Sequence, residues 1–178
     1  MTRAALVVAL ANAHAARRPP HARRAFVHDA LRDPASAAEL VRPFVDGTLE
    51  ARDVTALRAL QRALAPIVEA LIDGSPPPLE ALNALAAREP AIHALERGAD
   101  GELRPAIRPR SSSAAGKLLL DVVRELSELE PTRLRRCARS ECRLVFYDTT
   151  RSATQRWHAE RPCGLRERQR RHRAAHRR

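Results

Sequence analysis

Residues 137–163 read CARSECRLVFYDTTRSATQRWHAERPC and contain all three cysteines of this 178-residue chain. Four residues separate Cys137 from Cys142, four separate His158 from Cys163, and fifteen lie between the two pairs. Two close ligand pairs joined by a longer loop usually hold a single structural zinc ion. Thiolate and imidazole groups would fill all four positions and leave none for a water molecule. We therefore expect one structural Zn²⁺ and no chemistry at the metal.

Two other interpretations of these residues stay open at the level of sequence. The three thiols could be incidental buried cysteines with no metal. His172 and His176, spaced by one helical turn, could replace His158 as the fourth ligand. We disfavour the replacement because both histidines lie well beyond Cys163, on a helix that rises about 1.5 Å per residue away from the site.

The residues between the two ligand pairs predict the rest of a small zinc-binding fold. Residues 144–151 are rich in strand-forming side chains and end in a turn, and residues 153–157 are expected to form the return strand. The second ligand pair then stands at the entry to the last helix. A knuckle, a hairpin and a helix with ligands at its start form the treble-clef arrangement. In the turn, we expect Asp148 to cap the backbone or to form a salt bridge with Arg151; a simple turn residue is the alternative.

Positive charge is confined to the part of the chain that holds the cysteines. The net charge is +11, residues 131–178 carry all of this excess, and residues 1–130 are balanced. Nearly every basic residue is arginine, which a compositional bias explains, but such a bias does not explain the confinement to one end. A neutral body with a basic C-terminal end is typical of a polyanion-binding module.

The basic C-terminal run predicts a helix that contacts phosphate groups. It has no apolar stripe to bury, and its like charges repel one another unless a polyanion neutralises them. Arginine can also bind guanine edges in the major groove. A solvated, frayed tail is the alternative. The candidate nucleic-acid-binding residues are Arg166, Arg168, Arg170, Arg171, Arg173, Arg177 and Arg178.

Two aromatic residues of this region have two interpretations. Trp157 and Tyr147 could stack on bases, as in proteins that bind single strands or RNA. Trp157 is better explained as the packing residue of the finger, because a small module needs its one large apolar side chain inside.

Residues 1–130 predict a helical domain that carries a short β-hairpin. Only 3% of the chain is aromatic, so its core must consist mainly of Ala, Leu and Val, which favours helices. The strongest helix is expected over 51–73, where apolar residues recur every three or four positions. Asp33 and Pro34 predict the N-cap and first residue of a helix that extends to Phe44. Further helices are expected over 3–16, 22–31, 79–88 and 112–129, and the hairpin over 91–109.

Several function classes are disfavoured by the sequence. No uninterrupted apolar run approaches the roughly 20 residues of a membrane span. Odd cysteine usage argues against export, so we expect a cytoplasmic protein, associated with the nucleoid if it binds DNA. Residues 111–118 imitate a phosphate-binding loop, but Ser111 stands in place of Gly and Leu118 in place of Ser or Thr, so a helix start is expected. No Ser/His/Asp set can be named, and we expect no enzyme.

At the zinc-ligand array the chain resembles the CGNR zinc-finger family. Members of this family carry a Cys-(four)-Cys knuckle, a hairpin with an acidic residue, a Trp-Cys step and Cys-Gly-Asn-Arg before an arginine-rich helix. His158 stands where the family usually has Cys, which is a mild change because imidazole binds Zn²⁺ well, and Leu165 stands where it has Asn. The matching residues are Cys137, Cys142, Phe146, Asp148, Thr150, Arg151, Trp157, Cys163, Gly164, Arg166 and the basic run through Arg173.

The N-terminal part is similar in organisation to the ABATE domain that accompanies this finger. The resemblance implies a helical domain at 1–130, a finger at 131–178, and a role as a stress-responsive transcription regulator. In the first hypothesis the helical domain senses a small molecule or forms a homodimer, and the finger binds DNA. In the second, the chain is a zinc-stabilised adaptor whose basic helix binds RNA or an acidic protein.

Overall fold

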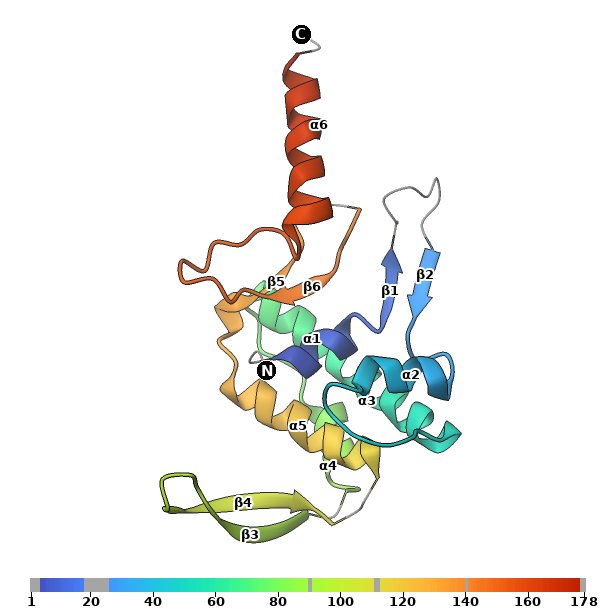
Figure 1. Ribbon diagram of the computed structural model, residues 1–178, viewed down its shortest axis with the longest axis vertical. Coiled ribbons are helices and arrows are strands. Elements are labelled where there is room, and N and C mark those ends of the chain that lie inside the picture. The colour runs from blue at the N-terminus through green and yellow to red at the C-terminus, as the bar shows by residue number, and fades with distance from the viewer. Residues whose placement is uncertain (1–3, 18–25, 90, 111–112, 140, 177–178) are drawn as a thin grey trace.

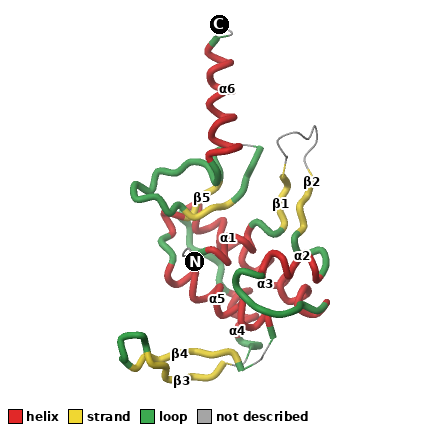
Figure 2. The backbone as a smooth tube through the Cα atoms, in the orientation of Figure 1, coloured by secondary structure: helices red, strands yellow, loops and turns green. Residues whose placement is uncertain are grey.

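The computed structural model describes residues 4–17, 26–89, 91–110, 113–139 and 141–176. In these ranges the chain is mainly α-helical and carries three two-stranded antiparallel sheets (Figure 1; Figure 2). None of the described helices is long and apolar enough to cross a membrane. The elements are α1 (Ala5–Ala11), β1 (His14–Arg17), β2 (Phe26–Asp29), α2 (Pro34–Val41), α3 (Ala51–Asp73), α4 (Glu80–Ala86), β3 (Ala91–Arg97), β4 (Leu103–Pro109), α5 (Ala114–Glu128), the single turn η1 (Pro131–Arg133), β5 (Leu134–Arg136), β6 (Val145–Tyr147), the wide turn η2 (Glu160–Gly164) and α6 (Leu165–Ala175).

Helix α3 is the centre of the helical body, and α1, α2, α4 and α5 all pack against it. Its predicted apolar face is confirmed, since Leu57, Leu64 and Ile67 are almost fully buried. The core around it is dominated by Leu, Val and Ala side chains, as the low aromatic content predicts. Val123 of α5 was expected inside and is instead 39% exposed, because it lies on the side of α5 that faces β4 and a surface hollow.

Capping residues start α2 and α5 where the sequence predicts them. Asp33 accepts a hydrogen bond from the Ser36 N–H at 2.8 Å and starts α2, which ends at Val41, so Phe44 lies in the following turn. Ser113 accepts a hydrogen bond from the Gly116 N–H at 3.0 Å and starts α5. Residues 113–118 are therefore a helix start, as expected; residues 111 and 112 lie outside the described residues.

The first 30 residues differ from the prediction. The helix expected over 3–16 ends at Ala11, and the described part of the helix expected over 22–31 is the strand β2 followed by a turn at residues 30 and 31. Strands β1 and β2 pair from His14 with Asp29 to Arg17 with Phe26. Each strand supplies the other with backbone hydrogen-bond partners, and this pairing overrides the helix propensity of the alanines.

Two side chains connect helix α1 to distant parts of the chain. The Glu125 carboxylate on α5 accepts hydrogen bonds from the Leu6 and Val7 N–H groups, at 3.2 and 2.9 Å, and so caps the start of α1. At the other end, Asn12 Nδ2 donates to the Val145 carbonyl at 2.8 Å and Asn12 Oδ1 accepts from the Val145 N–H at 2.9 Å. The amide thus pairs with β6 as a neighbouring strand would, and it holds β6 against the helical body.

The hairpin β5–β6 also contributes apolar side chains to the core of the helical body. Leu134 of β5 and Val145 of β6 are buried in the same apolar cluster as α1, α3 and α5. Arg136 of β5 forms an ion pair with Glu69 of α3. The root of the C-terminal region is therefore packed on the body rather than tethered by a linker.

Asn12→Ala is expected to lower the free energy of unfolding by about 1–3 kcal/mol, because it leaves the buried backbone groups of Val145 without partners. Denaturant unfolding measures the change. Asn83→Ala is the matched control, since Asn83 is an exposed residue of α4. Equal effects of the two substitutions would contradict the proposed role of Asn12.

Candidate metal centre and basic helix

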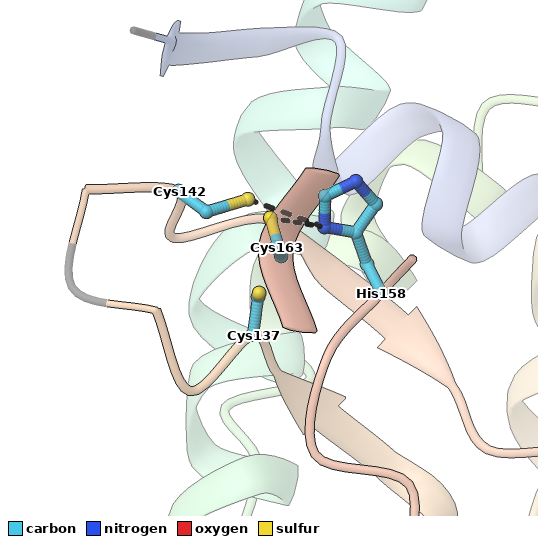
Figure 3. Close-up of side chains that lie close together, drawn as sticks. All are labelled: Cys137, Cys142, His158 and Cys163. Carbon is cyan, nitrogen blue, oxygen red and sulfur yellow. Dashed lines mark hydrogen bonds between the residues drawn. The ribbon is translucent and has the colours of Figure 1, made fainter. Parts of the chain in front are cut away.

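The four predicted zinc ligands converge at one point (Figure 3). Their ligand atoms all lie within 4.8 Å of one another. The Cys142 and Cys163 sulfurs lie 3.2 and 3.7 Å from Nδ1 of His158. In the described part of the chain this is the one group of three or more metal-ligand side chains, so His172 and His176 are not part of it. Those two rings instead stack on each other along α6, 4.0 Å apart.

The spacing of the four atoms fits a tetrahedral zinc ion. With Zn–S near ~2.3 Å and Zn–N near ~2.1 Å, tetrahedral ligands lie roughly 3.5–3.8 Å apart. The observed separations of 3.2 and 3.7 Å, with all four atoms within 4.8 Å of one another, are close to this size, and Nδ1 is the ring nitrogen that faces the sulfurs. All four positions belong to protein side chains. The cluster of Cys137, Cys142, His158 and Cys163 thus supports one structural zinc.

Burial makes the thiolates of this site dependent on a cation. Cys137 and Cys163 are buried, and Cys142 and His158 are half-buried. Burial, together with the neighbouring sulfurs Cys137 and Cys163, raises the pKa of Cys142 to about 12, although a backbone hydrogen bond from Leu144 acts in the opposite direction. Burial also raises the pKa of Cys163. Three close thiolates are stable here only with a divalent cation between them.

Arg139, inside the first knuckle, supplies a second positive charge at the site. Its side chain is only 14% exposed and forms an ion pair with Glu141. Burial opposes the charge of Arg139, but Glu141 and the Cys163 sulfur prevail and raise its pKa above the usual value. Zn²⁺ with three thiolates and a neutral imidazole has a net charge of about −1. Arg139 is placed to offset that charge.

The strands of the finger differ from those predicted. Residues 153–157 were expected to return alongside 144–151, but the partner of β6 is β5, which precedes the first knuckle and pairs Leu134 with Tyr147. Residues 153–157 are irregular because their backbone groups are used elsewhere. The Gln155 N–H donates to Asp148, and the Arg156 carbonyl accepts from the Ala138 N–H at 2.8 Å.

Asp148 organises this irregular loop. Its side chain is fully buried and accepts hydrogen bonds from the Thr150 N–H at 2.9 Å, the Thr150 hydroxyl at 2.6 Å and the Gln155 N–H at 2.8 Å. The expected cap is therefore confirmed. The ion pair differs from the expected one, since the nearby cation is Arg135 of β5, with Nε 3.9 Å from the carboxylate, rather than Arg151.

Acid is expected to destabilise the protein partly through Asp148. Burial opposes its ionisation, but the hydrogen bonds from Thr150 and Gln155 and the charge of Arg135 prevail and hold its pKa below the ordinary value of 3.8. Below about pH 4 the unfolded chain then binds more protons than the folded one, so stability falls as pH falls. Asp148→Asn is expected to be less stable than wild type at pH 7 and to show a shallower loss below pH 4.

Unfolding curves of both proteins from neutral to acid pH measure this difference. Zinc is also released in acid, but it is released from both proteins, so their difference isolates Asp148. Asp46→Asn, at an exposed aspartate, is the control. Parallel pH curves for wild type and Asp148→Asn would contradict the assignment.

The two aromatic residues near the site have different surroundings. The Tyr147 hydroxyl accepts a hydrogen bond from the Glu130 N–H at 3.1 Å, and its ring packs against the apolar core. Trp157 is half-buried, with the Arg156 guanidinium 5.6 Å from its ring centroid. Its indole nitrogen is buried. Both rings are thus engaged with the protein itself.

Helix α6 starts directly after the four clustered ligand side chains and projects away from the rest of the molecule (Figure 1). Cys163, in the turn η2, is a ligand and lies two residues before the first residue of the helix. None of the residues of α6 is buried. Arg166, Arg170 and Arg173 are spaced by four and three positions and therefore share one helix face. Arg177 and Arg178 lie outside the described residues.

Two acidic residues that the sequence did not single out, Glu160 and Glu167, pair with arginines of α6. Glu167 accepts hydrogen bonds from Arg170 at 2.6 and 3.0 Å and from Arg171 at 3.4 Å. The hydrogen bonds and charge of Arg170, and to a smaller extent those of Arg171, lower the pKa of Glu167 to about 2. Arg168 pairs with Glu160. The i,i+3 and i,i+4 spacing of Glu167 could have predicted its two pairs; the position of Arg139 beside Cys163 could not have been predicted.

Comparison with known proteins gives two family matches. Residues 133–176 match the family described as "CGNR zinc finger". Residues 4–145 match the ABATE family, described as "Putative stress-induced transcription regulator". The two matches overlap over residues 133–145, which include β5 and the start of β6. No curated protein matches the chain.

Proposed function

The chain belongs to the ABATE family and carries a CGNR zinc finger, and we propose that it is a transcription regulator that binds DNA through the finger and α6. The observation that carries the proposal is the position of α6. The helix begins at the metal cluster, extends away from the neutral body, and bears five arginines and one glutamate over Leu165–Ala175. A cationic helix with a fixed root and no buried face is suited to contact with phosphates in a groove.

In this proposal the role of the zinc ion is to stabilise the start of α6. An isolated helix of this length is marginal in water, and repulsion between arginines weakens it further. Zinc held by Cys137, Cys142, His158 and Cys163 would fix the turn from which α6 starts, and the ion pairs of Glu167 support the next turn. The arginines of α6 are thus ordered before DNA binds, which lowers the conformational-entropy cost of binding.

A hollow at the junction of body and finger supports a sensing role for the helical part. It is lined by residues of both regions, among them Leu71 and Ile72 of α3, Leu134 and Arg135 of β5, and Gln155. A small molecule bound there would contact the base of the finger and the body together. We propose this hollow as the place where a signal reaches the finger of a cytoplasmic, nucleoid-associated regulator.

Binding of the zinc-loaded chain to a labelled DNA duplex tests the function. Fluorescence anisotropy should show binding at low salt that weakens steeply as salt rises, with a slope of log K against log[salt] of about −3 to −5 for four or five phosphate contacts. Selection from random DNA should enrich one short motif. Equal binding to structured RNA and to any DNA would favour the adaptor function instead, and absence of duplex binding at low salt would exclude the proposal.

A further inference from the structure

The hairpin β3–β4 is the most exposed apolar element in the described part of the chain. Ile92, Leu95, Leu103 and Ile107 are 50–70% exposed, and they make up four of the seven large hydrophobic side chains that are exposed there. The hairpin lies at the end of the molecule opposite α6, and β4 is the strand that packs against α5 (Figure 1). A two-stranded sheet with so little support is marginally stable by itself.

The two faces of the hairpin follow from its register. Leu95 is opposite Pro105, His93 opposite Ile107, and Arg97 opposite Leu103, so these side chains share one face, which is exposed. Ala94 and Ala106 are opposite each other on the other face, and both are half-buried. The most apolar side of the hairpin thus faces solvent.

The two edges of the hairpin differ in their capacity to accept another strand. Proline has no N–H, so the pairs Leu95/Pro105 and Ala91/Pro109 are not the hydrogen-bonded ones, and their backbone groups point outward. Pro105 and Pro109 therefore remove two of the four outward donors of β4. On β3, the outward N–H groups belong to Ala91, His93, Leu95 and Arg97, and all four are present. The edge of β4 is protected against strand addition and the edge of β3 is not.

We propose that β3 pairs with β3 of a second copy of this chain, in antiparallel orientation about a two-fold axis at Ala94. This register pairs all seven residues of Ala91–Arg97 and brings the outward groups of His93 opposite those of the second Leu95. It joins two hairpins into one four-stranded sheet, β4-β3-β3-β4, whose outer edges are the ones that carry proline. A two-fold contact of a surface with itself is the commonest way for soluble proteins to form dimers.

The charges of β3 are compatible with this pairing. Glu96 falls opposite Ile92 of the second copy and Arg97 opposite Ala91, so no two like charges meet. Glu96 is held by Arg108 of its own hairpin at 2.7 Å, and Arg97 donates to the Gly101 carbonyl at 2.9 Å. Leu95 of each copy would lie beside His93 of the other and diagonally across from its Leu95, which accounts for the exposure of Leu95 in the single chain.

The proposed dimer has a consequence for the two fingers, and it does not depend on what the fingers bind. The open edge of β3 faces away from the body, at the end opposite α6 (Figure 1). Pairing there places the two basic helices at the far ends of an elongated dimer. Two such helices are suited to engage separate segments of a polyanion rather than adjacent half-sites.

Sedimentation velocity of the zinc-loaded full chain over a concentration series tests the dimer. Wild type should form a dimer, and His93→Pro should raise its dissociation constant at least about tenfold, because each protomer loses an outward donor and gains a ring at the edge. Ile107→Pro is the matched control. Ile107 is the cross-strand partner of His93, its N–H points to the edge of β4, and its substitution should leave the dimer of near wild-type strength.

A second pair of variants keeps the test independent of proline effects on folding. Across the axis, Ala94 faces Ala94 of the second copy as a non-hydrogen-bonded pair, with Cα atoms about 4.5 Å apart, within the range for a disulfide. Ala94→Cys should therefore give a covalent dimer on mild oxidation, and Ala106→Cys, one strand further out, should not. A wild-type chain that is monomeric at every concentration, or equal cross-linking by the two cysteines, overturns the proposal. DNA binding by a monomer would leave the proposed function intact.

Discussion

Replacing Cys163 with serine is expected to abolish zinc binding and to unfold the C-terminal finger. Cys163 is a buried ligand at the point where α6 begins, so its loss removes both a thiolate and the anchor of the helix. Structural zinc contributes about 10–16 kcal/mol in small zinc-binding modules, which is comparable to the whole stability of a domain, about 5–15 kcal/mol. Metal analysis should fall from one zinc per chain to none, and helical circular dichroism should decrease.

The histidines of the chain provide the control for this experiment. His158→Ala should also lose zinc, and His158→Cys should retain it, because a thiolate can take the same position. His172→Ala removes a histidine of α6 that stacks on His176 and lies outside the metal cluster, so it should keep one zinc. Retention of zinc and fold by His158→Ala would show that the fourth ligand is a different residue.

Loss of the arginine stripe of α6 is expected to remove most of the affinity for DNA. The triple substitution Arg166→Ala, Arg170→Ala, Arg173→Ala takes away the three arginines that share one helix face. If each contacts a phosphate, the salt slope should become shallower by about three, and affinity at low salt should fall at least about a hundredfold. Anisotropy titrations at several salt concentrations measure both quantities. Alanine has a high helix propensity, which offsets the loss of the Glu167–Arg170 ion pair, and the far-UV circular dichroism of the variant should show that α6 is retained.

Three exposed arginines of the body form the matched control. Arg42→Ala, Arg62→Ala, Arg88→Ala changes the net charge by the same amount, at positions that lie outside the finger. This variant should keep the wild-type salt slope and most of the affinity. Equal losses of DNA affinity in the two triple variants would mean that binding depends on total charge and not on α6.

Local patterns allowed the metal site and several elements to be predicted from sequence. The ligand set Cys137, Cys142, His158 and Cys163 follows from spacing, because two close pairs can surround one ion wherever the loop between them goes. Helix α3 matches its predicted range, since its apolar period and the glycine at its end are contained in the segment itself. The hairpin β3–β4 was predicted for the same reason, from two short runs around a turn.

The wrong predictions concern segments whose structure depends on which other segment they pair with. Strand β2 was predicted as helix because its pairing with β1 depends on a second segment. The return strand over 153–157 was predicted because those residues follow β6, but β6 pairs with β5, on the other side of the first knuckle. Of the two roles expected for Asp148, the cap is confirmed, but the nearby cation is Arg135 of β5 and not Arg151, which was chosen from proximity along the chain.

The sequence alone determined that a zinc-ligand array leads directly into an arginine helix, with all excess charge beside it and a neutral helical body before it. Spacing, periodicity and charge are local quantities, so they can be read without a structure. Only the tertiary structure decided how the finger is attached. Asn12 pairs with Val145 across 133 positions, Glu125 caps α1 across more than 110, and Leu134 and Val145 are buried in the body core. Such contacts depend on which surfaces meet when the chain folds, and no property of either segment by itself specifies them.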